Sequence, residues 1–115
     1  MKIEGDHVIC DVIVANFQEN FIKLAKEAIK TSKMKIVGFK KYEFKPQGTT
    51  AVWLLSESHF IIHTYPEHNY YSIDCYTCGN EGHPIEAINH FINNFKVISL
   101  NIKQIKRGVF NKKIK

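Results

Sequence analysis

A hydroxyl, an imidazole and a thiol lie close together in the middle of the sequence, at Ser58, His63 and Cys78. A hydroxyl or a thiol can act as a nucleophile, and an imidazole moves protons near neutral pH. The three residue types together therefore suit acyl transfer and proton transfer. Singly, each of them is more often structural, so the chemistry depends on whether the fold brings them together.

The segments that carry these residues predict a β-hairpin. Residues 60–65 are β-branched or aromatic and end at a proline, and residues 70–78 have the composition of a second strand. The intervening residues suit a loop of medium length. The two-residue period of a strand places His63 on one face with Ile61 and Tyr65, and Cys78 on one face with Asp74 and Tyr76. We therefore expect Ser58, His63 and Cys78 to meet around this hairpin.

Cys75 and Cys78 also form a C-x-x-C pattern, with His83 nearby. Such a pattern is found in zinc sites and in thiol redox sites. Residues three apart on a strand point to opposite faces, however, so the two sulfurs should diverge and we expect no metal. With Cys10 the cysteine count is odd and shows no disulfide-like spacing, which fits a reducing, cytoplasmic location.

The sequence contains four short segments at fixed distances from one another: Glu57-Ser58-His59, His63-Thr64, Pro66-Glu67 and Thr77-Cys78-Gly79. Together they resemble the signature of the small prokaryotic S-adenosylmethionine decarboxylases. Members of this family typically contain E-S-H, I-H-T-W-P-E and F-T-C-G at these spacings. The chain departs from the pattern at Tyr65, where the family commonly has tryptophan.

The resemblance implies a zymogen that cuts itself between Glu57 and Ser58, giving chains 1–57 and 58–115. In such a family the serine hydroxyl attacks the preceding carbonyl carbon, and the amide becomes an ester. Loss of the serine Cα proton, a step assigned to the residue matching His63, then expels the Glu57 carboxylate and leaves dehydroalanine, which hydrolyses to ammonia and a pyruvoyl group at position 58. A second hydroxyl assists the acyl shift; it is usually a serine, and by offset it falls at Thr50.

The resemblance also implies the activity. The pyruvoyl ketone derived from Ser58 would form a Schiff base with the α-amine of S-adenosylmethionine, and the adjacent carbonyl would accept the electron pair released with carbon dioxide. Cys78 matches the proton donor, and Glu67 matches a glutamate that holds the ribose hydroxyls. Phe44 and Phe60 are candidates for contacting adenine. The product of such a lyase is the aminopropyl donor for spermidine and other polyamines.

Two alternatives stay open at this point. A pyruvoyl-dependent decarboxylase could instead act on ornithine or arginine, although Glu67 favours a nucleoside substrate. An uncleaved, non-enzymatic relative is the other alternative, and the presence of Ser58, His63 and Cys78 argues against it.

The whole chain predicts a single soluble domain, residues 1–115. Hydrophobic residues make up 44% and charged residues 23% of the sequence, and no apolar run is long enough to span a membrane. Basic residues gather near the end, at Lys103, Lys106, Arg107, Lys112, Lys113 and Lys115, and contribute to a net charge of +5. We interpret them as a solvated, partly disordered tail. Nucleic acid is not an expected partner, because no recognition motif or interleaved aromatic residue accompanies them.

The remaining pattern predicts an α+β fold. Strands are expected at 7–14, 33–44, 50–55 and 97–105, and helices at 16–30 and 84–94, with Asn16 and Glu19 at the start of the first helix. Two helices on one face of a mainly antiparallel sheet leave the other face without cover. The resemblance implies that a homodimer covers it, as a helix–sheet–sheet–helix sandwich. It further implies composite sites, with Ser58 and Cys78 from one protomer and Thr50, His63 and Glu67 from the other.

Overall fold

The computed structural model describes residues 3–78 and 82–112 of the chain. In chain order the elements are β1 (Gly5–Val14), α1 (Phe21–Thr31), β2 (Ile36–Glu43), β3 (Thr49–Leu55), β4 (Ser58–Tyr65), the 3₁₀ turn η1 (Pro66–His68), β5 (Tyr70–Cys78), α2 (Pro84–Ile92) and β6 (Val97–Arg107). This order of strands and helices confirms the predicted α+β fold.

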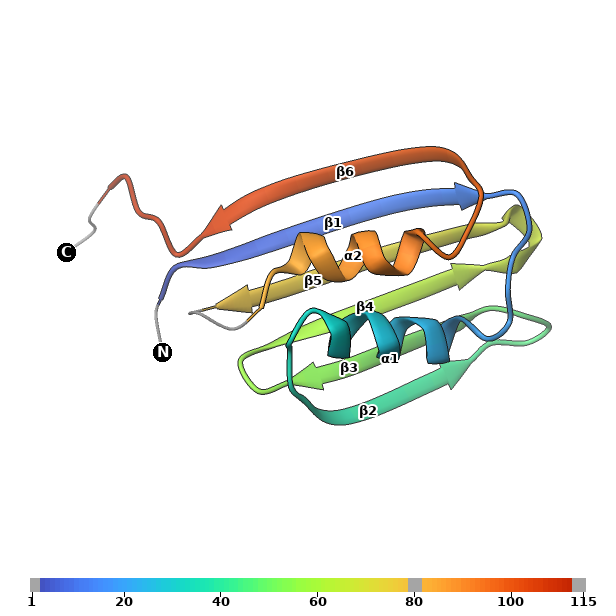
Figure 1. The fold of residues 1–115 in the computed structure, drawn as a ribbon, viewed down its shortest axis with the longest axis horizontal. Helices are drawn as coiled ribbons and strands as arrows, with labels where there is room; N and C mark the ends of the chain where they lie inside the picture. The colour runs from blue at the N-terminus through green and yellow to red at the C-terminus, as the bar shows by residue number, and fades with distance from the viewer. Residues whose placement is uncertain (1–2, 79–81, 113–115) are drawn as a thin grey trace.

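The strands form one sheet in the order β2-β3-β4-β5-β1-β6, and every neighbouring pair is antiparallel. Successive hairpins build the run from β2 to β5, whereas β1 and β6 pair at the far edge although they lie at opposite ends of the sequence. Both helices lie on the same side of the sheet, α1 near β3 and β4, and α2 near β5 and β1 (Figure 1). The described part of the chain is therefore a two-layer structure.

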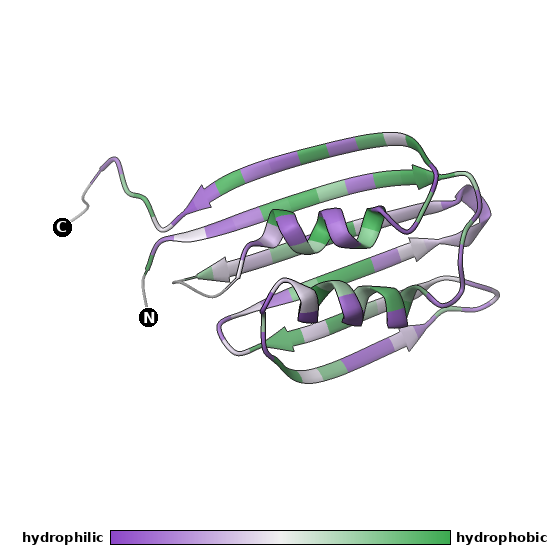
Figure 2. Ribbon diagram, in the orientation of Figure 1, coloured by the Kyte–Doolittle hydropathy of each residue, from purple (hydrophilic) through white to green (hydrophobic). Residues whose placement is uncertain are grey.

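The core lies between the helices and the sheet. Alternate residues of the central strands are buried there, and they bring the large side chains of Trp53, Phe60 and Tyr71 under the helices. Figure 2 shows the matching alternation of hydrophobic and hydrophilic bands along the strands. Since burial of apolar area is the main stabilising contribution, this alternation fixes which side chains face the helices.

The other face of the sheet, here called the open face, is not covered by a helix in the described part of the chain. Its strands present a mixture of polar and apolar side chains, and Ile13, Leu54, Tyr65 and Ile105 are 41–55% exposed. Thr50, His63 and Cys78 are in phase with this face, whereas Ser58, the first residue of β4, is in phase with the buried Phe60. The open face is therefore the surface on which the site must be built.

The first helix begins later than the sequence predicted. It starts at Phe21, with Asn20 as the N-cap, and no side chain caps it. Phe17 lies before the helix, where its ring stacks on Tyr71 at 5.0 Å between ring centroids and its backbone N–H donates to Asn69 Oδ1. The expected start at Asn16 is wrong because these tertiary contacts hold the segment in a loop.

The segment after α1 also differs from the prediction. Strand β2 begins at Ile36 rather than at residue 33, because Ser32 ends the helix and Lys33 adopts a φ of 64°. The turn at 46–48 is present, and it contains a cis Lys45–Pro46 peptide bond. The loop expected at 79–84 falls partly on residues 79–81, which lie outside the described residues.

The predicted basic tail is partly a strand. Lys103, Lys106 and Arg107 belong to β6, where Lys106 Nζ lies 2.9 Å from Asp6 Oδ1. The predicted strand, 97–105, is therefore confirmed and extends two residues further, to Arg107, because pairing with β1 continues to that residue. Neither described helix combines the length and the apolar character needed to cross a bilayer.

Candidate functional site

The peptide bond between Glu57 and Ser58 lies at a tight turn. Leu55 pairs with Ser58, so only Ser56 and Glu57 connect β3 to β4. Ser58 also pairs with Thr77 on the other neighbour, β5. Strand pairing on both sides therefore fixes the position of the serine, while the bond that precedes it lies in the connection.

Cys78 contacts this connection directly. Its Sγ lies 3.0 Å from the carbonyl oxygen of Glu57, with the thiol as donor. A hydrogen bond to a carbonyl oxygen draws electron density from the carbonyl carbon and stabilises negative charge that develops on the oxygen during attack. Glu57, Ser58 and Cys78 thus form one group, here called the cleavage half-site.

His63 lies at the other end of β4. It pairs with Thr50 on β3 and with Ser72 on β5, and its Nδ1 is 3.0 Å from the hydroxyl oxygen of Thr50. The imidazole is half-buried and projects from the open face. Thr50 and His63 are therefore neighbours, as proton-transfer partners would have to be.

A surface pocket of about 500 Å³ adjoins this pair. Its lining includes Phe44, Thr50, His63, Tyr65 and Glu67. Glu67 is exposed on η1 and places a carboxylate at the rim, and Tyr65 stacks on Tyr70 at 5.0 Å. Thr50, His63 and Glu67 are here called the pocket half-site. The pocket that they line has the size and the mixed polarity of a small-molecule site.

The two half-sites are far apart within one chain. Ser58 and His63 are five positions apart on the same extended strand, which at 3.3 Å per residue separates them by roughly 16 Å. The expectation that Ser58, His63 and Cys78 meet around one hairpin is therefore wrong for a single chain. The structure joins Ser58 to Cys78 and joins His63 to Thr50, and it does not join the two pairs.

Phe60 also differs from its predicted role. It is fully buried on the helix side of the sheet, where its ring packs edge-on against Trp53 at 5.8 Å. Phe60 is not among the residues that line the pocket, so it is a core residue and not an adenine contact. Phe44, by contrast, is 51% exposed, packs against Tyr42 at 4.9 Å and lines the pocket.

The C-x-x-C cysteines project from opposite faces of β5. Cys75 is fully buried under the helices, whereas Cys78 shares the face of Tyr76 and Asp74. Burial raises the pKa of both Cys75 and Cys10 to about 12, with a smaller contribution from the neighbouring Asp74 and Asp11 charges. None of the three cysteines is in a disulfide. This arrangement assigns different environments to thiols that the sequence presents as a pair.

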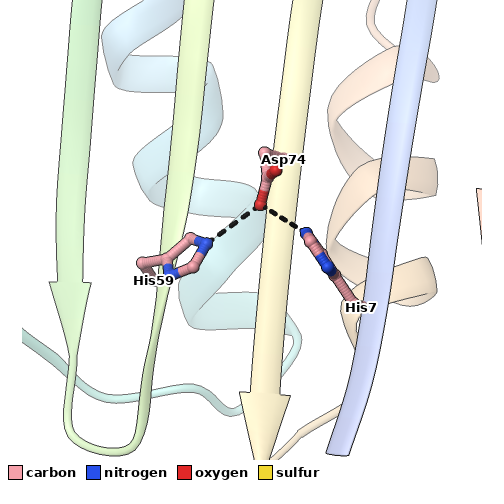
Figure 3. A group of neighbouring side chains, drawn as sticks. All are labelled: His7, His59 and Asp74. Atoms are coloured by element: carbon pink, nitrogen blue, oxygen red, sulfur yellow. Dashed lines mark hydrogen bonds and ion pairs between the residues drawn. The ribbon is translucent and has the colours of Figure 1, made fainter. Parts of the chain in front are cut away.

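Sequence reasoning missed one polar group on the open face. His7, His59 and Asp74 come from β1, β4 and β5, and their side chains converge (Figure 3). Their potential ligand atoms all lie within 4.8 Å of one another. In the described part of the chain, these three residues are the set whose side chains could contact one cation together. No spacing along the sequence signals it; only the strand order, which sets β5 between β4 and β1, reveals it.

Comparisons with known proteins agree with one another. A family model described as S-adenosylmethionine decarboxylase matches residues 3–108. A protein of Bacillus cereus named S-adenosylmethionine decarboxylase proenzyme 2 is 39% identical over 110 residues, covering 91% of this chain and 89% of its own length. A protein of Acetivibrio thermocellus named S-adenosylmethionine decarboxylase proenzyme is 32% identical over 120 residues, covering 100% of this chain and 97% of its own.

A solved structure is similar over the whole chain as well. The adenosylmethionine decarboxylase from Aquifex aeolicus superposes with a TM-score of 0.83 at 27% sequence identity, and the match covers 100% of this chain and 99% of that one. The arrangement of sheet and helices is therefore shared with a protein of the same description as the sequence relatives.

Proposed function

Because this chain belongs to the S-adenosylmethionine decarboxylase family, we propose that its activity, the decarboxylation of S-adenosylmethionine, depends on self-cleavage between Glu57 and Ser58. The family works as proenzymes that convert a serine into a pyruvoyl group and supply the aminopropyl donor for polyamine synthesis. The observation that carries the choice of bond is the hydrogen bond from the Cys78 thiol to the Glu57 carbonyl.

The cleavage half-site supports the first covalent step. The Ser58 hydroxyl adds to the Glu57 carbonyl carbon, the C–N bond breaks, and the Glu57 acyl group passes from nitrogen to oxygen. The Cys78 thiol, 3.0 Å from the carbonyl oxygen, stabilises the charge on that oxygen during the transfer. Removal of the Ser58 Cα proton then breaks the bond to the Glu57 carboxylate, and hydrolysis of the resulting enamine releases ammonia and leaves a ketone.

Position 58 fits the group that this reaction would produce. The residue is held by β3 and β5 at the start of a strand, and the ketone supplies an electron-accepting centre next to an amide carbonyl. The Cys78 thiol lies near the end of the neighbouring strand, which supports its role as donor of one proton to the product carbon. Cys78 would thus serve both the cleavage and the turnover.

The proton-transfer partner has to come from elsewhere. His63 of the same chain lies roughly 16 Å along β4 from Ser58, so it cannot remove the Ser58 Cα proton. We infer that a second copy of the chain brings its pocket half-site to this cleavage half-site. Each dimer would then contain two composite sites, each with Ser58 and Cys78 from one protomer and Thr50, His63 and Glu67 from its partner.

The open face supports this dimer. The helices cover only the other side of the sheet, and apolar residues such as Leu54 and Ile105 remain 55% and 42% exposed. Pairing two such faces would give a helix–sheet–sheet–helix sandwich and would bury these residues.

The buried thiols Cys10 and Cys75 fit the expected cytoplasmic location.

The pocket half-site supports binding of the nucleoside part of the substrate. The Glu67 carboxylate can accept hydrogen bonds from two adjacent ribose hydroxyls, and Phe44 offers an exposed ring to the base. A basic amino acid such as ornithine has neither group to match.

Intact-mass analysis of purified protein, beside a Ser58→Ala chain, tests the proposal. We expect two fragments from the wild type, residues 1–57 and 58–115, the second lacking a free amino terminus, and one uncut chain from Ser58→Ala. Wild-type protein that stays in one piece at every incubation time, or that is cut at another bond, would contradict the proposal.

A further inference from the structure

Asp74 is the centre of a hydrogen-bonded group on the open face. Its Oδ1 lies 2.9 Å from His59 Nε2 and 2.9 Å from His7 Nε2 (Figure 3). The three side chains belong to β4, β5 and β1, so the group ties three neighbouring strands together. No step proposed above uses any of them.

Arg107 fixes the direction of the hydrogen bond between His7 and Asp74. Its Nη1 lies 3.1 Å from His7 Nδ1, and because a guanidinium only donates, Nδ1 must accept. The proton of His7 is then on Nε2 and is donated to Asp74, which also receives the Nε2 proton of His59. A metal ion would need a free lone pair on His7 Nε2. Because Nδ1 accepts from Arg107, Nε2 carries the proton and has no free lone pair. The group is therefore a hydrogen-bond network rather than a metal site.

The Tyr76 ring packs against the side chains of this network. Its ring centroid lies 5.6 Å from that of His7 and 5.9 Å from that of His59, and the Arg107 guanidinium carbon lies 5.6 Å from it. Tyr76 pairs directly with His59 across the β4–β5 ladder. The side chains that surround His59 are thus packed as well as hydrogen-bonded.

This network adjoins the bond that the proposed cleavage breaks. His59 follows Ser58, and Asp74, Tyr76 and Cys78 occupy successive positions on the same face of β5. In the uncut chain, the turn through Ser56 and Glu57 holds the start of β4 against β3. Once that turn is open, residue 58 becomes a chain terminus, and terminal residues of strands fray unless side chains hold them.

On the premise of the proposed cleavage, we propose that Asp74 is a positioning residue for the cut enzyme. By holding His59 on β5, it keeps residue 58 beside the Cys78 thiol after the turn to β3 has opened. His7 and Arg107 hold the Asp74 carboxylate in the orientation that His59 requires. The network thereby replaces the covalent connection that cleavage removes.

The test compares Asp74→Ala, Asp74→Asn and Asp6→Ala with the wild type. Asparagine keeps an oxygen acceptor for both imidazoles, and Asp6 is an exposed aspartate whose partner is Lys106, so it is a matched control outside the network. For each protein, decarboxylation of S-adenosylmethionine is measured per cleaved chain, and hydrogen exchange is followed in the peptide that starts at residue 58.

We expect Asp74→Ala to lower kcat roughly tenfold or more, with KM changed by less than about twofold, because the ketone is displaced while the pocket half-site is intact. Exchange at the start of β4 should become faster in the same variant. Asp74→Asn should restore most of kcat, and Asp6→Ala should match the wild type. His59→Ala, which removes the other side of the same contact, should repeat the loss of kcat if Asp74→Ala folds poorly.

A purely structural role would lower the yield of folded protein without changing kcat per cleaved chain. Wild-type kcat and exchange in both Asp74→Ala and His59→Ala would overturn this inference alone. A wild-type chain that is never cut would overturn the proposed function, and this inference with it.

Discussion

Thr50 falls, by its offset in the sequence, at the position where the resemblance to the family leads us to expect a serine. Its hydroxyl oxygen lies 3.0 Å from His63 Nδ1, so the polar contact of the pocket half-site is present despite the extra methyl group. Because the hydroxyl is the part of the side chain that can assist the acyl shift, we expect its removal to slow self-cleavage more than removal of the methyl group does.

Two substitutions at this position separate the hydroxyl from the methyl. We expect Thr50→Val, which keeps the shape and removes the hydroxyl, to slow self-cleavage at least tenfold, corresponding to roughly 1.4 kcal/mol of lost hydrogen bonding in the transition state. Thr50→Ser should cleave as fast as the wild type or faster. The rate is followed by the disappearance of full-length chain, and equal rates for Thr50→Val and the wild type would contradict the role.

The buried cysteines make a prediction about pH. The pKa of Cys10 and Cys75 is raised from 9.0 to about 12 in the folded protein, mainly by burial. Below pH 9 both thiols are protonated whether or not the chain is folded. Between about pH 9 and 12 the unfolded chain loses these protons and the folded chain keeps them, so the stability of the fold falls as the pH rises.

Alkylation with iodoacetamide tests, residue by residue, whether folding keeps these thiols protonated. In native protein at about pH 10, we expect modification of Cys10 and Cys75 to be slow, because the reactive thiolate is scarce there. In denaturant at the same pH both should react quickly. Rapid modification of either residue in native protein would show that its thiol is not protected by burial.

At the scale of the elements, the start of β1 is packed against the end of β5. A Cβ at Gly5 would lie 2.7 Å from the Thr77 carbonyl oxygen and 2.9 Å from the Tyr76 ring. Glycine is needed at this position because no side chain fits between the two strands. The close approach also supports the strand end that carries Cys78.

The two strand glycines, Gly5 and Gly38, therefore make a matched pair of tests. We expect Gly5→Ala to lower the free energy of unfolding by about 1–3 kcal/mol, because backbone atoms of β5 would have to move. Gly38→Ala meets nothing closer than Leu54 Cβ at 3.5 Å, so it should be neutral or slightly stabilising. Urea denaturation of both variants gives the comparison, and equal midpoints would contradict the packing argument.

At the scale of the whole molecule, the separation of the half-sites predicts complementation between two inactive chains. A Ser58→Ala chain keeps its pocket half-site, and a His63→Ala chain keeps its cleavage half-site. Neither should cut itself when expressed alone. In a mixed dimer one composite site is complete, so the His63→Ala chain should be cleaved.

Co-expression of the two chains with different tags provides the measurement. With equal amounts and random pairing, roughly half of the His63→Ala chains should be cut, and none of the Ser58→Ala chains. Absence of cleavage in the mixture would contradict the composite site. Cleavage of the His63→Ala chain when it is expressed alone would contradict the role of His63.

The class of fold and most of its strands and helices could be predicted from the sequence alone. The strand at 70–78, the helix from Pro84 and the alternation around His63 follow from periodicity and from the local preferences of proline and β-branched residues. The motif that contains Glu57, Ser58 and Cys78 also spans one hairpin of the structure, in which Ser58 and Cys78 lie on adjacent strands. These features depend mostly on neighbours along the chain.

Features that depend on strand order and on side-chain contacts between distant segments could not be predicted from the sequence. Phe17 has the spacing of a helical residue, but its stacking on Tyr71 holds it outside α1. Phe60 matched a candidate for substrate contact, but burial under the helices removes it from the pocket. The Asp74 network arises because the order β4-β5-β1 aligns one face of three strands, and the distance along β4 divides the site. These outcomes are set by packing across the sheet, which local sequence patterns do not encode.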